Sequence, residues 1–161
     1  MYNILNYITV FITSLLPIAE VRGSIPLALI LFNDFNEEVL AIVLAIIGNL
    51  LVAPIALSIL NYLDRLIRSL RCIPSAILKT YIRLLERARR EGVKVEKKGL
   101  IGLTIFVAIP LPVTGAWTAS LIVFIMGFNR FKSLIAIELG VLIASTIVLI
   151  ISGFLQYVII S

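Results

Sequence analysis

The chain has 161 residues, of which 61% are hydrophobic, and a mean hydropathy of +1.13. A soluble domain of this length does not have such a composition, and several apolar runs exceed the roughly 18 residues that mark a membrane span. With no histidine and one cysteine, Cys72, the sequence excludes Cys/His metal sites, internal disulfides and Ser-His or Cys-His catalysis. It therefore predicts an all-α integral membrane protein, one domain over residues 1–161, without a cleavable signal peptide. We expect no metal, no cofactor and no enzymatic activity.

The net charge of +5 is unevenly distributed along the chain. Residues 63–98 hold 11 of the 14 basic residues but only four of the nine acidic ones. Short basic loops stay on the cytoplasmic side of a membrane, so we expect this segment to be cytoplasmic. Its charge indicates contact with anionic lipid headgroups and does not indicate nucleic acid. The expected partners are therefore membrane lipids, and a homodimer is left open.

The first apolar run contains a polar group that does not suit a plain membrane helix. Its sequence there is Pro17-Ile-Ala-Glu-Val-Arg-Gly-Ser-Ile-Pro26, with Glu20 and Arg22 between the prolines. Proline removes a backbone donor, and ionisable groups at membrane depth are costly. Residues 4–16 alone are too short to cross the apolar core. We expect a re-entrant hairpin that enters and leaves on one side, with a second helix from about residue 25. The alternative is one kinked spanning helix with a salt-bridged pair.

The chain then continues through a connector, a span and the basic segment. Residues 33–38 form an acidic connector, and residues 39–62 are long enough to span, with Gly48 and Asn49 near the middle. Within the basic segment, apolar residues between 77 and 88 follow helical spacing while basic residues share the other face. This pattern predicts an amphipathic helix on the cytoplasmic membrane surface.

The second half has the same order of elements. Residues 100–109 form a short leg, Pro110 and Pro112 lie in a break, and residues 119–128 return. A basic connector, residues 129–132, precedes a span over residues 134–160 that contains Glu138 and Gly140.

A shift of 92 positions relates the two halves. It places Gly23 on Gly115 and Gly48 on Gly140. A hairpin does not cross the membrane and a span does, so the second half starts on the opposite side. The sequence thus predicts an inverted repeat, with repeat 1 over residues 1–62, the cytoplasmic linker over 63–98 and repeat 2 over 99–161. Both termini are then outside, whereas four ordinary spans would put the basic connector 129–132 outside, against the positive-inside rule.

Two hairpins that enter from opposite faces bring their tips together near the membrane midplane. The first tip offers Arg22, Gly23 and Ser24, with Ser24 as the expected N-cap of a helix and Pro26 in its first turn. At the second tip Thr114 and Gly115 would begin a helix in the same way, and Trp117 follows them. Helix N-termini and a guanidinium are natural binding groups for phosphate or carboxylate. The tips are therefore the expected anion-binding site.

Glu20 and Glu138 are the candidate proton carriers. Glu20 either neutralises Arg22 or takes up protons; Glu138 has no opposing cation in its own turn, which favours it slightly as the carrier, unless it faces Arg130 or Lys132. Trp117 is either a packing or interface residue or a wall of the substrate path. We expect Asn49 to bond an unwound backbone at a tip.

Several other residues have expected structural roles. Gly48 and Gly140 would let the spans approach closely. The Ser145 and Thr146 hydroxyls would bond their own helix. The remaining helix-breaking residues are Pro17, Pro26, Pro110 and Pro112.

Both breaks resemble signatures of a known family. Residues 20–26, Glu-Val-Arg-Gly-Ser-Ile-Pro, resemble the E-x-R-G-x-I-P signature of the small multidrug export proteins. Residues 110–118 resemble the second signature of that family, P-L-P-G-T-G-A-W-T, with Val113 in place of a glycine. The family is considered a distant relative of the DedA and VTT-domain membrane proteins, which are similar in having inverted repeats with re-entrant hairpins. Those relatives carry an arginine near the second hairpin, and this sequence has none there.

The resemblance implies a membrane transporter or lipid translocase. It would move an anionic amphiphile such as a polyprenyl-phosphate carrier lipid, with proton coupling. Two alternatives are a small multidrug efflux transporter and a non-transporting scaffold that holds anionic lipids through the basic helix.

Overall fold

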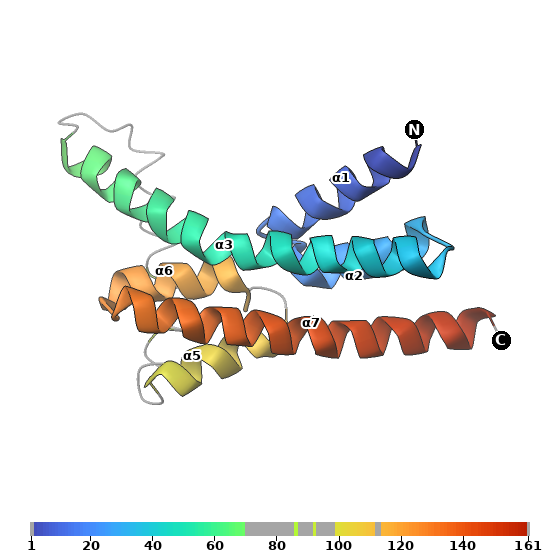
Figure 1. Ribbon diagram of the computed structural model, residues 1–161. Coiled ribbons are helices and arrows are strands. Elements are labelled where there is room, and N and C mark those ends of the chain that lie inside the picture. The colour runs from blue at the N-terminus through green and yellow to red at the C-terminus, as the bar shows by residue number, and fades with distance from the viewer. Residues whose placement is uncertain (1, 70–85, 87–91, 93–98, 112–113, 161) are drawn as a thin grey trace.

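The computed structural model describes residues 2–69, 86, 92, 99–111 and 114–160. In these parts the chain forms α1 (Tyr2–Leu15), α2 (Glu20–Leu31), α3 (Phe35–Ser69), α5 (Gly99–Ala108), α6 (Ala116–Met126) and α7 (Arg130–Ile160), as Figure 1 shows. The described residues are thus all-helical, as predicted. The amphipathic helix expected between residues 77 and 88 lies almost wholly outside them, as do Cys72, Pro112 and Val113.

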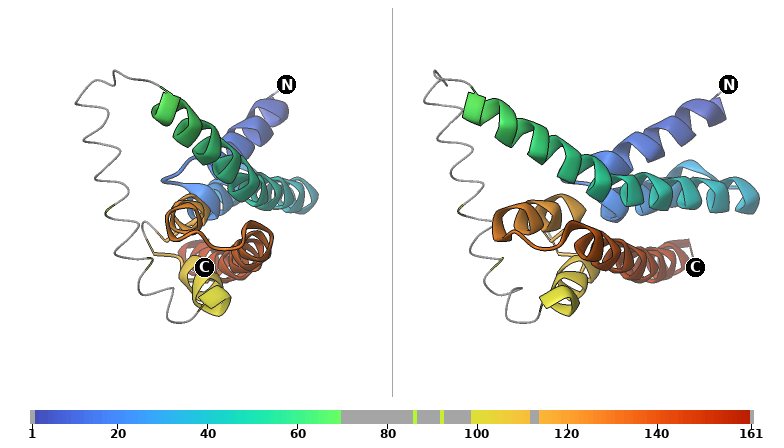
Figure 2. Two further views of the ribbon diagram at one scale, coloured as in Figure 1. Left: turned by 90° about the vertical axis from the view of Figure 1, so that its left-hand side faces the viewer. Right: turned by 60° about the vertical axis from the view of Figure 1, so that its left-hand side comes forward.

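The two long helices form the centre of the molecule, and the short helices are arranged around them. α3 contacts α1, α2 and α6, while α7 contacts α2, α5 and α6, and the two long helices contact each other. α1 and α5 lie on opposite outer sides of the α3–α7 pair in every view (Figures 1 and 2). α2, from the first half, therefore reaches the long helix of the second half, and α6 reaches that of the first.

Both pairs of short helices turn back in the middle of the molecule. α1 ends and α2 begins near the centre of the view, and α5 and α6 reverse there from the other end (Figure 1). The N- and C-termini lie at the same end. α1, α2, α5 and α6 have 14, 12, 10 and 11 residues, so each is shorter than the roughly 20 residues of a spanning helix.

Two glycines allow the outer helices to contact the long ones closely. A Cβ atom on Gly48 of α3 would lie 2.0 Å from Ser14 Oγ of α1. A Cβ atom on Gly140 of α7 would lie 2.6 Å from Val107 Cβ and 2.8 Å from the Thr104 carbonyl oxygen of α5. These distances confirm the expected close approach at both positions. Thr104 also donates from Oγ1 to the Ala136 carbonyl of α7 at 3.0 Å.

Both long helices begin with a side chain that caps the free amides of the first turn. Asp34 Oδ1 accepts from Asn36 N at 2.9 Å, and Asn129 Oδ1 accepts from Lys132 N at 3.1 Å. Short polar residues are preferred at this position because four amides of each first turn lack a partner within the helix. The capping residues explain why α3 and α7 begin at residues 35 and 130, four residues earlier than predicted in each case.

Buried apolar side chains form two clusters, each with residues from both halves of the chain. One is centred on Leu103, Ile122 and Ile137, and the other on Ile25 and Val10. Large apolar side chains such as Ile4, Ile101 and Ile150 are two-thirds or more exposed on the outside. An apolar exterior of this kind is typical of a protein surrounded by lipid.

The second helix begins earlier than predicted, and this corrects the expected role of two residues. α2 begins at Glu20 and Ala19 precedes it as N-cap, so Ser24 is not the N-cap and Pro26 lies inside the helix. Ser24 instead donates from Oγ to the Glu20 carbonyl at 2.7 Å. Neighbouring protein satisfies the backbone of proline-containing helices in membrane proteins, which is why a proline does not mark a helix start reliably there.

Candidate functional site

Arg22 connects the first break to the second. One guanidinium nitrogen, Nη1, donates to the Leu111 carbonyl, and Nη2 donates to Thr114 Oγ1 at 3.2 Å. Leu111 and Thr114 lie between α5 and α6, where proline leaves carbonyls without a partner in the helix. The forked geometry of arginine therefore holds two separate groups of the opposite tip.

Thr114 organises the turn that receives Arg22. Its Oγ1 lies 2.7 Å from the Ile109 carbonyl and 2.9 Å from the Leu111 carbonyl, and it accepts from Leu111 N at 3.3 Å. One hydroxyl thus replaces several backbone hydrogen bonds that the broken helix does not make. Arg22 and Thr114 were both predicted as tip residues, and the structure brings them together.

Glu20 points across the molecule to the start of α6. Only 3% of its surface is exposed, and Oε1 accepts from the Trp117 amide at 3.4 Å, with the Ala116 amide also directed at the carboxylate. A Cβ atom on Gly115, the N-cap of α6, would lie 2.0 Å from Glu20 Oε2. The carboxylate therefore occupies the space that a side chain at residue 115 would fill.

This arrangement gives α6 a capping group from another part of the chain. Gly115 is extended, with φ −92° and ψ −173°, and makes no side-chain cap of its own. The free amides and the positive dipole end of a helix favour a carboxylate. Gly115 is thus the N-cap, as predicted for this tip, but the anion at that N-terminus is a residue of the protein.

The backbone of Glu20 has a rare conformation. Its φ angle is +47°, in the left-handed region that side-chain-bearing residues seldom adopt. Ser24 is fully buried and its hydrogen bond to the Glu20 carbonyl helps to hold this conformation. Gly23 contacts Ala19, because a Cβ atom there would lie 2.9 Å from Ala19 Cβ. Ser24 and Gly23 therefore stabilise the first tip through contacts with their own neighbours in the chain, Glu20 and Ala19.

Glu20 and Arg22 attract each other electrostatically but do not form a direct ion pair. Each makes its hydrogen bonds to the second break, so the simple salt-bridged pair considered above is wrong in detail. Arg22 Nε is buried and donates to no group in the described part of the chain. Arg22 Nε–H is therefore a donor that a ligand could use.

Trp117 makes the third link between the breaks. Its indole Nε1 donates to the Leu15 carbonyl at 3.0 Å. Leu15 is the last residue of α1, where helix carbonyls lack partners within the helix. Trp117 also packs against the buried cluster that contains Leu103 and Ile122, in agreement with one interpretation of the sequence. Neither interpretation included the hydrogen bond that joins the two tips.

A comparison with protein families matches residues 20–147 to the family described as "Putative small multi-drug export protein". The chain belongs to this family. The matched region begins at Glu20 and includes both breaks and their contacts. Comparison with curated proteins and with solved structures gives no match. Two helices of this family member, Phe35–Tyr62 and Arg130–Gln156, are long and apolar enough to cross a membrane, in agreement with a membrane protein.

Other predicted site residues of this family member lie away from the tip contacts. Glu138 is half-buried in α7, and its Oε2 is buried without a hydrogen-bond partner among the described residues. It forms no ion pair with Arg130, which donates to Asn61 of α3. Asn49 is 1% exposed within the continuous α3, and its Oδ1 accepts nothing from the described residues, so the expected bond to a tip stays a prediction. Ser145 and Thr146 bond their own helix, as predicted.

Several groups that connect the helices were not identified from the sequence. The carbonyls of Leu15 and Leu111 are acceptors that a side-chain pattern cannot indicate. Gln156, the only glutamine of the chain, donates from Nε2 to the Leu29 carbonyl at 3.4 Å. Its amide in an otherwise apolar span was the signal available in the sequence.

Proposed function

We propose that this chain is a proton-coupled transporter of an anionic amphiphile, of the polyprenyl-phosphate kind, and that the crossing of its two helix breaks is the headgroup site. One observation carries the proposal: the buried Glu20 carboxylate lies at the N-terminus of α6, beside Arg22. The same amides and guanidinium are the groups that would bind a phosphate. Glu20 therefore competes with the substrate for its own site.

Competition couples the substrate to a proton. When Glu20 is ionised, its charge offsets the α6 N-terminus and Arg22, and no anion is needed there. When Glu20 accepts a proton, the amides of Ala116 and Trp117 and the guanidinium lose that counter-charge. An anionic headgroup then restores it, so proton and anion travel together.

The proposal includes two inverted repeats with re-entrant hairpins, residues 1–62 and 99–161. Three observations support it: both short-helix pairs turn back at the middle, both termini lie at one end, and Gly48 and Gly140 each contact the first short helix of their own half. In transporters of this kind the substrate site lies at the repeat interface near the midplane. In this proposal the contact between the breaks is that site.

Export of amphiphilic cations is the second candidate, and two observations favour it. The family description speaks of multi-drug export, and Glu138 has a buried carboxylate oxygen without a partner among the described residues. The contact between the breaks suits a cation poorly, because Arg22 and a helix N-terminus are both positive. A cation would therefore use Glu138 and not Glu20.

Flux through proteoliposomes tests these alternatives. A fluorescent dodecyl phosphate and ethidium serve as anionic and cationic probes, each with and without a pH gradient. We expect flux of the phosphate probe to follow the gradient, and Glu20→Gln to remove that dependence while exchange without a gradient remains, because glutamine is permanently neutral. Glu138→Gln is the matched control and should retain the gradient dependence. Gradient-driven phosphate flux in Glu20→Gln would contradict the proposal, and ethidium flux that only Glu138→Gln abolishes would favour the second candidate.

The same assay tests Arg22. Lysine keeps the charge but cannot reach both Leu111 and Thr114, and each lost hydrogen bond to a charged group is worth about 1.5–3 kcal/mol. We therefore expect Arg22→Lys to reduce phosphate flux by about tenfold or more. Arg130→Lys, which changes an arginine bonded to Asn61 away from the breaks, is the control and should transport normally. Normal flux with Arg22→Lys would make Arg22 a structural residue only. A non-transporting scaffold would give no flux of either probe in any variant.

A further inference from the structure

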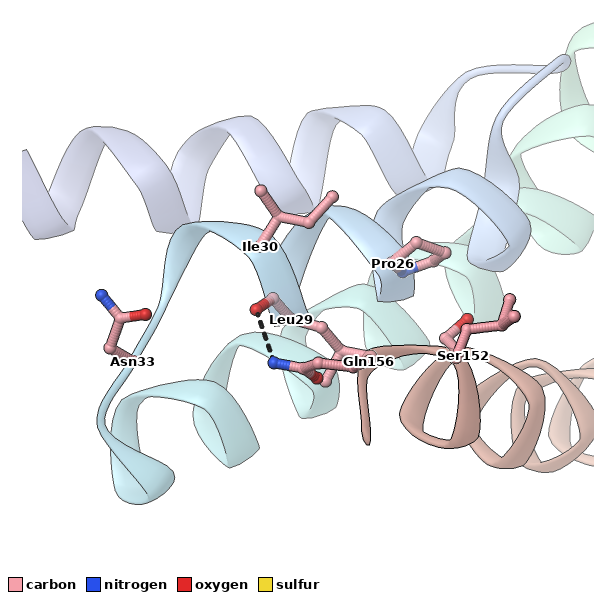
Figure 3. A pocket seen from close by; sticks show the side chains of 7 residues that line it. Pro26, Leu29, Ile30, Asn33, Ser152 and Gln156 are labelled. Atoms are coloured by element: carbon pink, nitrogen blue, oxygen red, sulfur yellow. Dashed lines mark hydrogen bonds between the residues drawn. The ribbon is translucent and has the colours of Figure 1, made fainter. Parts of the chain in front are cut away.

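A groove lies between the second half of α2 and the last turns of α7. Its volume is about 450 Å³, within the range of ligand-binding pockets. Figure 3 shows Pro26, Leu29 and Ile30 of α2 opposite Ser152 and Gln156 of α7. Asn33 and Leu155 complete the lining. Ile30 is 76% exposed and Leu155 is 53% exposed, so the groove is not closed by other described parts of the chain.

The groove has apolar walls and a polar outer end. Pro26, Leu29, Ile30 and Leu155 provide the walls. The amides of Asn33 and Gln156 lie toward the end of α2, where Gln156 donates to the Leu29 carbonyl. A hydrocarbon chain fits such walls, whereas a polar ligand of the same size would find few hydrogen-bond partners there.

The groove continues a line that starts at Arg22. Arg22, Pro26 and Leu29 are spaced four and three residues apart, which places them on one face of α2. Pro26 is one turn from Arg22, about 6 Å along the helix axis. A ligand whose charged head reaches Arg22 would therefore have its chain directed into the groove.

The equivalent place in the second half is closed. The shift of 92 residues takes Ile30 of α2 to Ile122 of α6. Ile122 is fully buried, in a cluster with Val52 and Leu57 of α3, while Ile30 is 76% exposed. Two related positions thus differ, one open at the end where both termini lie and the other packed shut. A transporter with alternating access has this asymmetry when its site faces one side.

We infer that the α2–α7 groove binds the hydrocarbon chain of the anionic amphiphile while its head occupies the site at Arg22. The inference rests on the proposed function for the head and on the groove itself for the chain. It assigns Ile30 and Leu155 as residues that determine chain length, and it identifies the end that holds the termini as the open side.

The affinities for two alkyl phosphates measure the contributions of the hydrocarbon chain and of the charged head separately. Dodecyl phosphate and butyl phosphate are titrated into the full chain in lipid nanodiscs by calorimetry, with empty nanodiscs measuring partition into lipid. We expect dodecyl phosphate to bind at least tenfold tighter than butyl phosphate. Ile30→Trp fills the groove and should lower the affinity for dodecyl phosphate about tenfold without changing that for butyl phosphate. Ile143→Trp is the matched control: Ile143 is 46% exposed on the face of α7 opposite Ser152, and both affinities should stay unchanged.

A second measurement needs no variant. Dodecyl phosphate with a diazirine at the chain end, photolysed with the wild-type chain, should label residues 26–33 and 149–156. Labelling confined to other segments, or an unchanged dodecyl affinity in Ile30→Trp, would overturn the groove assignment. If dodecyl phosphocholine, which has no net charge, binds as tightly as dodecyl phosphate, the link between the groove and Arg22 is overturned. If butyl phosphate does not bind, or binds to Arg22→Lys as tightly as to the wild type, the assignment of the headgroup site is wrong. The photolabelling and the dependence of affinity on chain length then still test the groove assignment.

Discussion

At the scale of single residues, Glu20 combines three features that are each unfavourable alone. It is a buried carboxylate, it has a positive φ angle, and it begins a helix without a capping side chain before it. The left-handed conformation alone costs roughly 1–2 kcal/mol. The nearby Arg22 charge and the Ser24 hydrogen bond offset part of these costs within α2, whereas the α6 amides do so only while the two breaks are in contact. A change in the charge of Glu20 therefore changes how strongly the breaks hold each other.

Gly115→Ala tests the fit of Glu20 against α6. The new Cβ atom would lie 2.0 Å from Oε2 and 2.2 Å from Oε1, so the carboxylate must move. We expect a loss of roughly 1–3 kcal/mol in stability, as for other overpacked sites, together with loss of gradient-dependent flux. Thermal unfolding in one detergent measures the first effect.

Gly153→Ala is the control for this substitution. Nothing lies within 4 Å of a Cβ atom at residue 153, which is inside α7. Alanine favours a helix over glycine by roughly 0.5–1 kcal/mol, so this variant should unfold at the same or a higher temperature. Equal unfolding temperatures for Gly115→Ala and Gly153→Ala would show that the carboxylate does not need the space beside residue 115.

The sequence could predict which residues lie at the tips, but not how they pair. The two tips were expected to face each other, and Arg22 does bond Thr114, whereas the residue that lies against Gly115 is Glu20. The 92-residue shift places Glu20 opposite Pro112, so internal symmetry gave no reason to pair it with Gly115. Partners almost a hundred residues apart depend on the packing of whole helices, which local patterns do not contain.

At the scale of helices, the two close approaches differ in what a side chain would meet. At Gly140 the obstacles are Val107 Cβ and a backbone oxygen, which cannot rotate away. At Gly48 the nearest obstacle is the Ser14 hydroxyl, which donates to the Phe11 carbonyl at 2.6 Å and can change rotamer. The α5–α7 contact is therefore less tolerant than the α1–α3 contact.

Alanine at each glycine should reveal this difference. We expect Gly140→Ala to lower the unfolding temperature more than Gly48→Ala, since rigid atoms must move. Ser14→Ala removes the hydroxyl and should restore part of the stability of Gly48→Ala, so the two changes should not be additive. Additive effects, or a greater loss at Gly48, would contradict the contacts described for α1 and α3.

Helix ends were predicted well where proline stops a helix and poorly where it lies inside one. Pro17 and Pro110 follow α1 and α5 closely, within two residues of their ends. Pro26 and Pro54 lie inside α2 and α3, and the interpretation of Pro26 as a helix start moved α2 by about five residues. The difference is physical: a proline inside a helix is tolerated where neighbouring groups satisfy the freed carbonyl.

At the scale of the whole molecule, the two halves use the same elements in different states. α1 and α5 approach their long helices through Gly48 and Gly140, and α2 and α6 each contact the long helix of the other half. Yet the α2–α7 contact leaves a groove of about 450 Å³, while Ile122 fills the related place on α6. The order of elements follows from composition and could be predicted. The open and closed grooves depend on side-chain packing, which a repeat of so few identical residues cannot specify.

The membrane topology is the prediction on which the arrangement of the whole chain depends. With two re-entrant hairpins, both termini lie outside and residues 129–132 lie inside with the basic linker; with four ordinary spans, all three locations are reversed. Single cysteines in a Cys72→Ser background, labelled with an impermeant maleimide on intact cells, distinguish these cases. Asp34→Cys and Glu86→Cys are the controls, because both topologies place the first outside and the second inside. We expect Tyr2→Cys to react on intact cells and Lys132→Cys only after permeabilisation, since this arrangement keeps Arg130 and Lys132 on the cytoplasmic side. A protected Tyr2→Cys with a reactive Lys132→Cys would mean that both short-helix pairs cross the membrane, and the contact between the breaks would then need another explanation.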